Sequence, residues 1–175
     1  MKKLLLIIWL FFTSLLLGQS ANSSVGVGLG IGSFIGNFPT QTTFGTKFFF
    51  ETESPLKIFN MLKIHFSAAQ KIEKFLPDSY TYDHYSYFTS FGFSGIFNQP
   101  LNEYLNIQQG VGLIYLNDRS FSDIDSWNFG VLLNFGIGTP ISSSVDLSIN
   151  IDYGITVNNT NASYFLFFVV GKFQL

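Results

Sequence analysis

Residues 25–32 have the sequence Val-Gly-Val-Gly-Leu-Gly-Ile-Gly, in which bulky aliphatic residues alternate with glycines. A period of two is typical of a β-strand, because successive side chains in a strand point to opposite faces of the sheet. A nucleotide-binding glycine loop needs a strand–turn–helix context instead, so the alternation favours packing in a strand. One face of this strand is therefore bulky and apolar, and the other carries no side chains.

The same alternation continues to the end of the chain in seven further segments. We predict strands over residues 42–52, 56–67, 80–97, 103–116, 127–138, 145–157 and 162–175, which makes eight with the first. An even number of strands is what single-chain bacterial outer-membrane barrels require. Prolines fall between these segments, in keeping with a residue that fixes φ and cannot donate to a strand ladder.

The composition limits what such a chain can be. Of its 175 residues, 47% are hydrophobic, 18% are aromatic and only 11% are charged, whereas a soluble domain carries roughly 25% charged residues. This excludes intrinsic disorder. Nine Lys and Arg against eleven Asp and Glu give no basic surface for nucleic acid. Because cysteine is absent, the chain has no disulfides, no thiolate metal site and no cysteine nucleophile.

The second face of each strand indicates the surroundings of the barrel. A soluble lipocalin-like barrel also alternates, but its outer face meets water and carries charge. Here the face opposite the bulky residues is small and mostly uncharged, as at Gly92, Gly112 and Gly136. Small residues suit the narrow lumen of an eight-stranded barrel, and a bulky apolar face on every strand suits lipid. We therefore predict an all-β, eight-stranded antiparallel up-and-down transmembrane barrel, with a secreted soluble binding barrel as the alternative.

The first twenty residues have the three parts of a secretory signal. A cationic start (Met1-Lys2-Lys3) precedes an apolar stretch over residues 4–17 and the small or polar residues Gly18-Gln19-Ser20. The apolar stretch is shorter than the roughly 20 residues of a spanning helix. We predict a signal peptide over residues 1–20, cleaved after Ser20, and a barrel domain over residues 21–175.

The predicted connections alternate in length. Three tight links each hold a proline, Pro55, Pro100 or Pro140, while the links over residues 68–79 and 117–126 are longer and polar. Short turns at one end and long loops at the other are typical of outer-membrane barrels. The termini are then periplasmic, and the two long links are expected to contact partners outside the cell.

Charged residues within the strands share the parity of the small residues. Glu51 and Lys57 flank the Pro55 link and are expected to pair across the second and third strands; the other inward charges are Lys47, Lys63, Asp146, Asp152 and Lys172. Eight strands leave little open bore. We expect these charges to form salt bridges that plug the lumen, with no solute path.

The signal, the eight alternating segments and the aromatic last strand (residues 164–175, with Phe173 two residues before the final Leu175) resemble the OmpA/OmpX-like outer membrane protein β-barrel domain. The last strand is similar to those that the barrel-assembly machinery reads. The resemblance implies export to the bacterial outer membrane, a monomeric barrel, and contacts with the lipid bilayer and with that machinery during biogenesis. It covers residues 25–175 and names no extracellular partner.

One tripeptide offers an enzymatic alternative. His84-Tyr85-Ser86 places an imidazole and a hydroxyl on one strand face and is similar to the H-x-S element of lipid A deacylases, which are eight-stranded outer-membrane esterases. The resemblance implies His84 as base and Ser86 as nucleophile, and a strand pairing with residue sum 202 would bring Asp118 opposite His84. Tyr87 stands where that family has Asn, and no Glu matches its acid.

The sequence thus predicts a non-enzymatic envelope or surface-interaction protein, with an outer-membrane lipid esterase and a soluble lipocalin-like barrel as alternatives. It indicates no catalytic residue for the first function and no cofactor. It also indicates no metal, because Asp118, Asp123 and Asp125 lack the spacing of a calcium loop.

Overall fold

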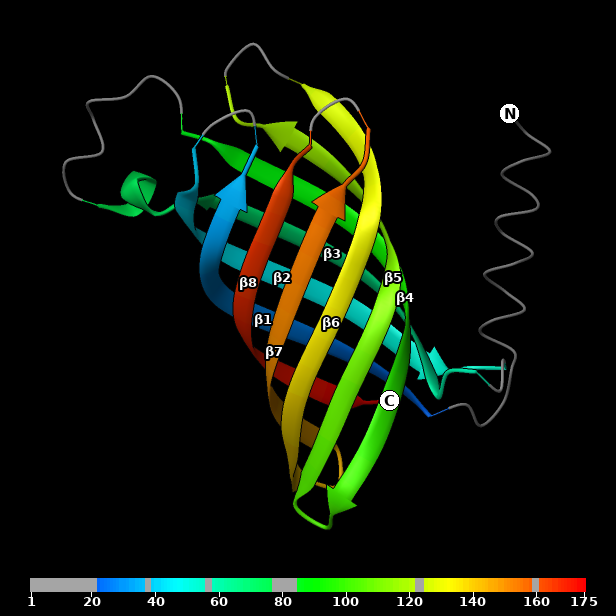
Figure 1. Ribbon diagram of the computed structural model, residues 1–175. Helices are drawn as coiled ribbons and strands as arrows, with labels where there is room; N and C mark the ends of the chain where they lie inside the picture. Colours follow the sequence, from blue (N-terminus) through cyan, green and yellow to red (C-terminus); the bar gives the residue numbers. More distant parts are fainter. Residues whose placement is uncertain (1–21, 37–38, 56–57, 77–84, 122–124, 159–160) are drawn as a thin grey trace, which may run out of the picture.

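The computed structural model describes residues 22–36, 39–55, 58–76, 85–121, 125–158 and 161–175. The predicted signal peptide and His84 lie outside these residues. In the described part of the chain, eight antiparallel strands form a closed barrel in the order β1-β2-β3-β4-β5-β6-β7-β8 (Figure 1). The bounds are β1 Ser23–Ile35, β2 Gln41–Glu53, β3 Met61–Lys71, β4 Tyr87–Asn102, β5 Leu105–Arg119, β6 Ser126–Ser142, β7 Val145–Thr156 and β8 Ser163–Gln174. The predicted eight-stranded barrel is confirmed.

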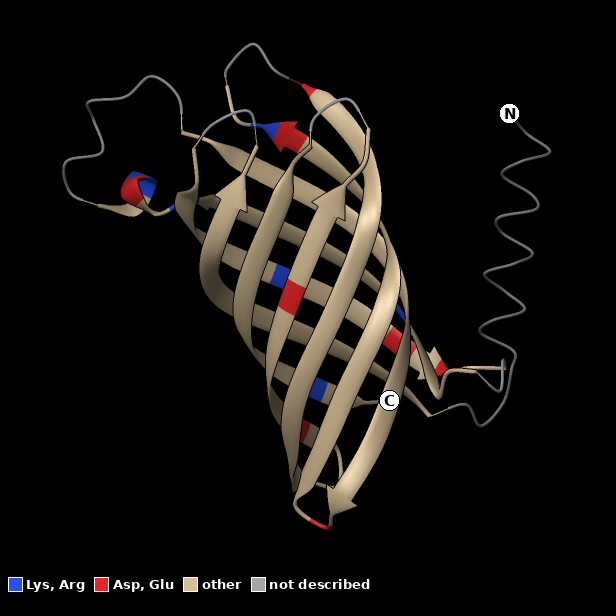
Figure 2. Cartoon of the chain, in the orientation of Figure 1, with Lys and Arg blue, Asp and Glu red and all other residues tan. Residues whose placement is uncertain are grey.

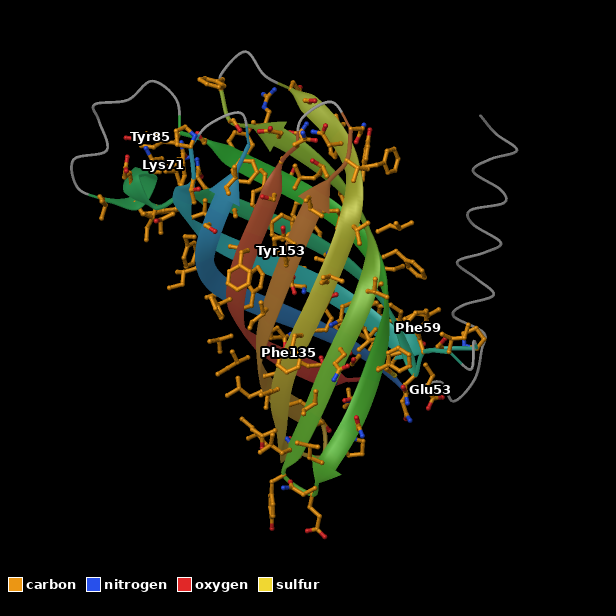
Figure 3. The ribbon with its side chains drawn as sticks, viewed as in Figure 1. Glu53, Phe59, Lys71, Tyr85, Phe135 and Tyr153 are labelled. Carbon is orange, nitrogen blue, oxygen red and sulfur yellow. The ribbon has the colours of Figure 1, made fainter. Side chains whose placement is uncertain are left out.

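The alternation places the two kinds of side chain as expected. Along β1, Val25, Val27, Leu29 and Ile31 are exposed on the outer wall, whereas Gly26, Gly28 and Gly30 are buried in the lumen. On the front wall in Figure 3, Phe135 and Tyr153 belong to the outward set. Across the described residues, no helix has the length and apolarity needed to cross a membrane.

The glycines of β1 are required where the barrel closes on itself. β1 pairs with β8 as well as with β2, with Gly30 opposite Phe168 and Gly32 opposite Leu166. A Cβ atom at Gly30 would lie 2.1 Å from the Phe167 carbonyl oxygen, and one at Gly32 would lie 1.9 Å from that of Phe165. The close approach of two backbones therefore excludes any side chain there.

Two of the predicted proline turns are wrong. Pro100 lies within β4 and Pro140 within β6, each at a register shift next to the end of its strand. The turns follow, at residues 103–104 and 143–144. A proline is tolerated at such an irregularity because the ladder is already interrupted and no N–H is needed. The turn after Asn102 is closed by its side-chain oxygen, which accepts a 2.8 Å hydrogen bond from the Tyr104 N–H.

The third and fourth strands lie later in the sequence than predicted. β3 begins at Met61 and continues through Ala68 and Ala69 to Lys71, where a four-residue 3-10 helix, η1 (Ile72–Phe75), follows. β4 begins only at Tyr87. The Ala-Ala-Gln stretch carries no alternation of bulky residues, yet it extends the ladder because β2 and β4 lie on both sides of it.

Candidate functional site

The lumen contains an ion-pair network at the turn end of the barrel. Glu51 on β2 lies 2.6 Å from the Lys63 Nζ and 3.7 Å from the Lys172 Nζ, and Lys172 lies 3.2 Å from the Asp146 carboxylate. Glu51 and Lys63 are nearly fully buried. The inward placement predicted for these charges is correct. The expected partner Lys57 lies outside the described residues, and Lys63 and Lys172 pair with Glu51.

A second pair bridges the middle of the lumen. The Lys47 Nζ of β2 donates to Asp152 Oδ2 of β7 over 2.5 Å, and the Asn134 Nδ2 donates to Asp152 Oδ1 over 2.6 Å. Figure 2 shows charged positions of both signs in the middle of the barrel wall. The two ion-pair groups together hold three lysines and three carboxylates, so the formal charges of these six side chains cancel.

Little free volume remains around these charges. A cavity of about 10 Å³ lies between Lys63, Asn134 and Asp152, which is the room of a single water molecule. His65 fills the lumen on the β3 side, where a Cβ atom at Gly92 would lie 2.1 Å from its Cε1. The charged side chains of the two ion-pair groups are thus closely packed around this small cavity.

An apolar layer separates the charges from the loop end. The Phe88 ring lies 4.8 Å from the Phe34 ring and stacks 4.7 Å from the Tyr164 ring, centroid to centroid. Leu116 and Leu166 complete this buried layer. This layer was not predicted, although Phe34 shares the inward parity of Gly26 to Gly32.

Of the predicted catalytic group, the structure describes Ser86 and Asp118, while His84 lies outside the described residues. β4 and β5 pair with a residue sum of 206, which places Asp118 opposite Phe88, so the assumed sum of 202 is wrong. The Ser86 hydroxyl donates to the Ser120 carbonyl oxygen over 2.8 Å. Asp118 is buried, and its Oδ1 accepts hydrogen bonds from the Ser120 hydroxyl and from the Ser120 N–H.

The loop end of the outer wall carries aromatic and charged side chains together. Tyr115 of β5 stacks on Trp127 of β6 with ring centroids 4.6 Å apart. Nearer the loop end of β5, the Arg119 Nε donates a hydrogen bond to the Tyr87 hydroxyl over 3.2 Å. The Arg119 guanidinium also lies 2.9 Å from the Asp125 carboxylate. Aromatic side chains below a charged rim are typical of the boundary between hydrocarbon and water.

No cluster of three or more His, Cys, Asp or Glu side chains suited to a metal ion occurs among the described residues. Glu51, Asp146 and Asp152 are instead paired with lysines, as described above.

Known proteins resemble this chain in structure and not in sequence. No protein-family model matches it, and no curated protein matches its sequence. The crystal structure of Neisserial surface protein A (NspA) matches with a TM-score of 0.69 at 12% identity, over 90% of this chain and 100% of that one. The chain has the fold of the small eight-stranded outer-membrane barrels.

A second match agrees with the first. Ail, the attachment invasion locus protein of Yersinia pestis, solved in complex with the heparin analogue sucrose octasulfate, matches with a TM-score of 0.59 at 10% identity, over 89% of this chain and 99% of that one. At such identities the structural similarity shows a shared arrangement of strands and does not show a shared ligand.

Proposed function

We propose that this chain is an integral protein of the bacterial outer membrane, exported by the signal at residues 1–20, that acts without catalysis through its extracellular loops. The observation that carries the proposal is the outer wall, which exposes large apolar side chains on every strand of the barrel. In water such a surface would drive aggregation. In a bilayer the same side chains contact lipid acyl chains. Closure of the barrel also leaves no unpaired strand edge in the hydrocarbon.

The lumen supports a role other than transport. The charges of its ion-paired lysines and carboxylates cancel, the cavity beside them has the volume of one water molecule, and the Phe34–Phe88–Tyr164 layer lies between them and the loops. Moving an ion through this bore would require breaking buried ion pairs and displacing packed rings. We therefore propose a plugged barrel whose surface activity lies in its loops.

The hydrogen bonding at the loop end also supports a non-enzymatic role. The Ser86 hydroxyl is engaged with a backbone carbonyl, and Asp118 accepts its hydrogen bonds from Ser120. Among the described residues, no hydrogen bond joins the Ser86 hydroxyl to the Asp118 carboxylate. The extracellular partner is not identified by these features.

Cell fractionation with gel electrophoresis tests the proposal. A membrane barrel is expected in the outer-membrane fraction as a band that migrates faster unheated than after boiling. Planar-bilayer recordings on the same preparation are expected to show no conductance or a very small one. A protein that stays in the periplasm without detergent would overturn the membrane assignment, and large steady currents would overturn the plugged lumen.

A further inference from the structure

The outer wall of the barrel has a groove at the loop end of β2, β3 and β4. Its floor is a row of small outward side chains, in which Thr46 pairs with Ala68 and Ala68 pairs with Thr89 across neighbouring strands. The groove has a volume of about 280 Å³, and the outward residues that line it are Phe44, Thr46, Ala68, Gln70, Phe75 and Tyr87. Small residues in a wall that is otherwise bulky thus leave a shallow slot.

Aromatic side chains form both edges of the slot. On the turn side, Phe48 pairs with Phe66, and the Phe66 ring lies 4.9 Å from that of Phe91. On the loop side, the Phe75 ring of η1 meets the Phe44 ring edge-on at 5.7 Å. Apolar rings therefore bound the slot on its turn side and on its loop side.

The short helix η1 places apolar side chains outside the barrel. Figure 1 shows it beside the loop ends of the strands, projecting from the wall. Phe75 and Leu76 are 61% and 51% exposed. Large apolar groups exposed next to lysines are typical of segments that lie in the headgroup region of a bilayer.

The cationic side chains outside the lumen lie at the loop end of the barrel, where Lys71 is paired with Glu73 and Arg119 with Asp125. Among the described residues, the lysines and arginine outside the lumen network are Lys71, Lys74 and Arg119. Lys71 ends β3, Lys74 is on η1, and Arg119 is joined to Tyr87 of β4. Figure 3 shows Lys71 next to η1 at the loop end.

A polar hollow lies on the loop side of the slot. It has a volume of about 540 Å³ and is lined by Pro39, Thr40, Gln41, Thr42, Lys71, Ile72 and Glu73. Lys71 is paired with Glu73 over 2.7 Å, with side chains 25% and 44% exposed. A surface pair of this kind is weak, so an anion of higher charge density competes with Glu73 for the ammonium group.

We propose that the slot and the hollow together bind one lipid that carries an anionic phosphate headgroup. An acyl chain lies over Ala68 between the aromatic edges, and the phosphate lies in the hollow beside Lys71 and Lys74. The apolar floor accounts for the acyl chain, and Lys71 of the hollow, with Lys74 on the adjoining η1, accounts for the anionic headgroup. The inference rests on the proposed membrane location and adds a ligand class to it.

Lipid retention by the full-length protein tests the site. The protein is reconstituted in nanodiscs with equal amounts of phosphatidylglycerol and phosphatidylcholine of identical acyl chains, then extracted into mild detergent and examined by native mass spectrometry. We expect one retained phosphatidylglycerol and little phosphatidylcholine. Because a cation near an anionic surface strengthens binding about fivefold, Lys71→Gln with Lys74→Gln is expected to reduce the preference roughly 25-fold.

Steric filling gives an independent variant with a matched control. Ala68→Phe fills the slot and is expected to lower phosphatidylglycerol retention at least to the level of the lysine variant. Val131→Phe adds an aromatic ring to the outward face of β6 instead and is expected to retain the lipid. Each variant is first shown to fold by heat-modifiable migration. If Ala68→Phe does not fold, the lysine variant still tests the site, because it does not alter the slot.

Three outcomes would overturn the lipid site. Equal retention of the two lipids would show that the slot contacts bilayer lipid without selecting an anionic headgroup. Unchanged retention in Ala68→Phe would place the bound lipid elsewhere. A wild-type dimer that is lost in Ala68→Phe would make a second copy the occupant. In each case a folded outer-membrane band leaves the proposed function intact, whereas absence of that band contradicts the proposed function itself.

Discussion

Lys47 on β2 and Asp152 on β7 form an ion pair across the lumen with an Nζ–Oδ2 distance of 2.5 Å, although 105 residues separate them in the sequence. Both side chains are fully buried. Two charges taken out of water are favourable together only if they are paired and hydrogen-bonded, and Asn134 supplies a further bond to Asp152. The pair therefore ties opposite parts of the wall together.

Removing one partner is expected to cost more than removing both. Lys47→Met or Asp152→Leu alone leaves a buried uncompensated charge and should lower the free energy of unfolding by about 3–5 kcal/mol. The double variant should recover most of that loss, because apolar groups of similar volume then fill the lumen. Urea unfolding of the barrel in lipid vesicles, followed by heat-modifiable migration, measures this. A double variant as unstable as the sum of the single variants would contradict the coupling.

The glycines at the closure of the barrel give a second prediction. Gly32→Ala brings a Cβ atom to 1.9 Å from the Phe165 carbonyl oxygen, so the β1–β8 backbones must separate. We expect a loss of about 3 kcal/mol, the upper end for overpacked sites, and a lower yield of folded barrel in the same vesicle assay. Gly171→Ala on β8 is the control, since its Cβ atom would meet nothing within 4 Å, and should change stability by no more than about 0.5 kcal/mol.

The faces of the strands could be predicted from the sequence because they depend only on parity. Lys47, Lys63 and Asp152 share the parity of the small residues, and all three are buried in the lumen. Which charges meet depends on strand register, and a shift by an even number of residues leaves every side chain on its face. Parity therefore predicted the inward charges and could not predict that Lys63 pairs with Glu51.

The candidate site was harder to predict for the same reason. Placing the turn at Pro100 implied a residue sum of 202 for β4 and β5. The turn at residues 103–104 instead pairs Asn102 with Leu105, and the register shift between Pro100 and Asn102 then gives a sum of 206 along the rest of the two strands. Asp118 then faces Phe88. The slot over Ala68 could not be predicted, because its floor is formed by residues of three strands whose register the sequence does not give. Its loop-side edge also depends on η1, which no periodicity in the sequence indicates.

The apolar layer at the loop end yields a third prediction. Phe88 is fully buried between Phe34 and Tyr164, so Phe88→Ala leaves a cavity and should cost about 3–5 kcal/mol. Phe91→Ala, three residues along β4, removes a ring that is 53% exposed on the outer wall. Fluid acyl chains refill that space, so the loss there should be smaller. Equal losses of unfolding free energy for Phe88→Ala and Phe91→Ala in lipid vesicles would contradict the tighter packing of the lumen face.

A substitution at Ser86 distinguishes a structural role of its hydroxyl from a catalytic one. Its hydroxyl donates a buried 2.8 Å hydrogen bond to the Ser120 carbonyl oxygen, so Ser86→Ala should cost about 1 kcal/mol of stability. If that bond is its role, neither the wild type nor Ser86→Ala releases fatty acid from vesicles of lipid A or phospholipid. Ser144→Ala, in an exposed turn, is the control for both readouts. Hydrolysis by the wild type and by Ser144→Ala that disappears in Ser86→Ala would make Ser86 a nucleophile and refute the non-enzymatic function.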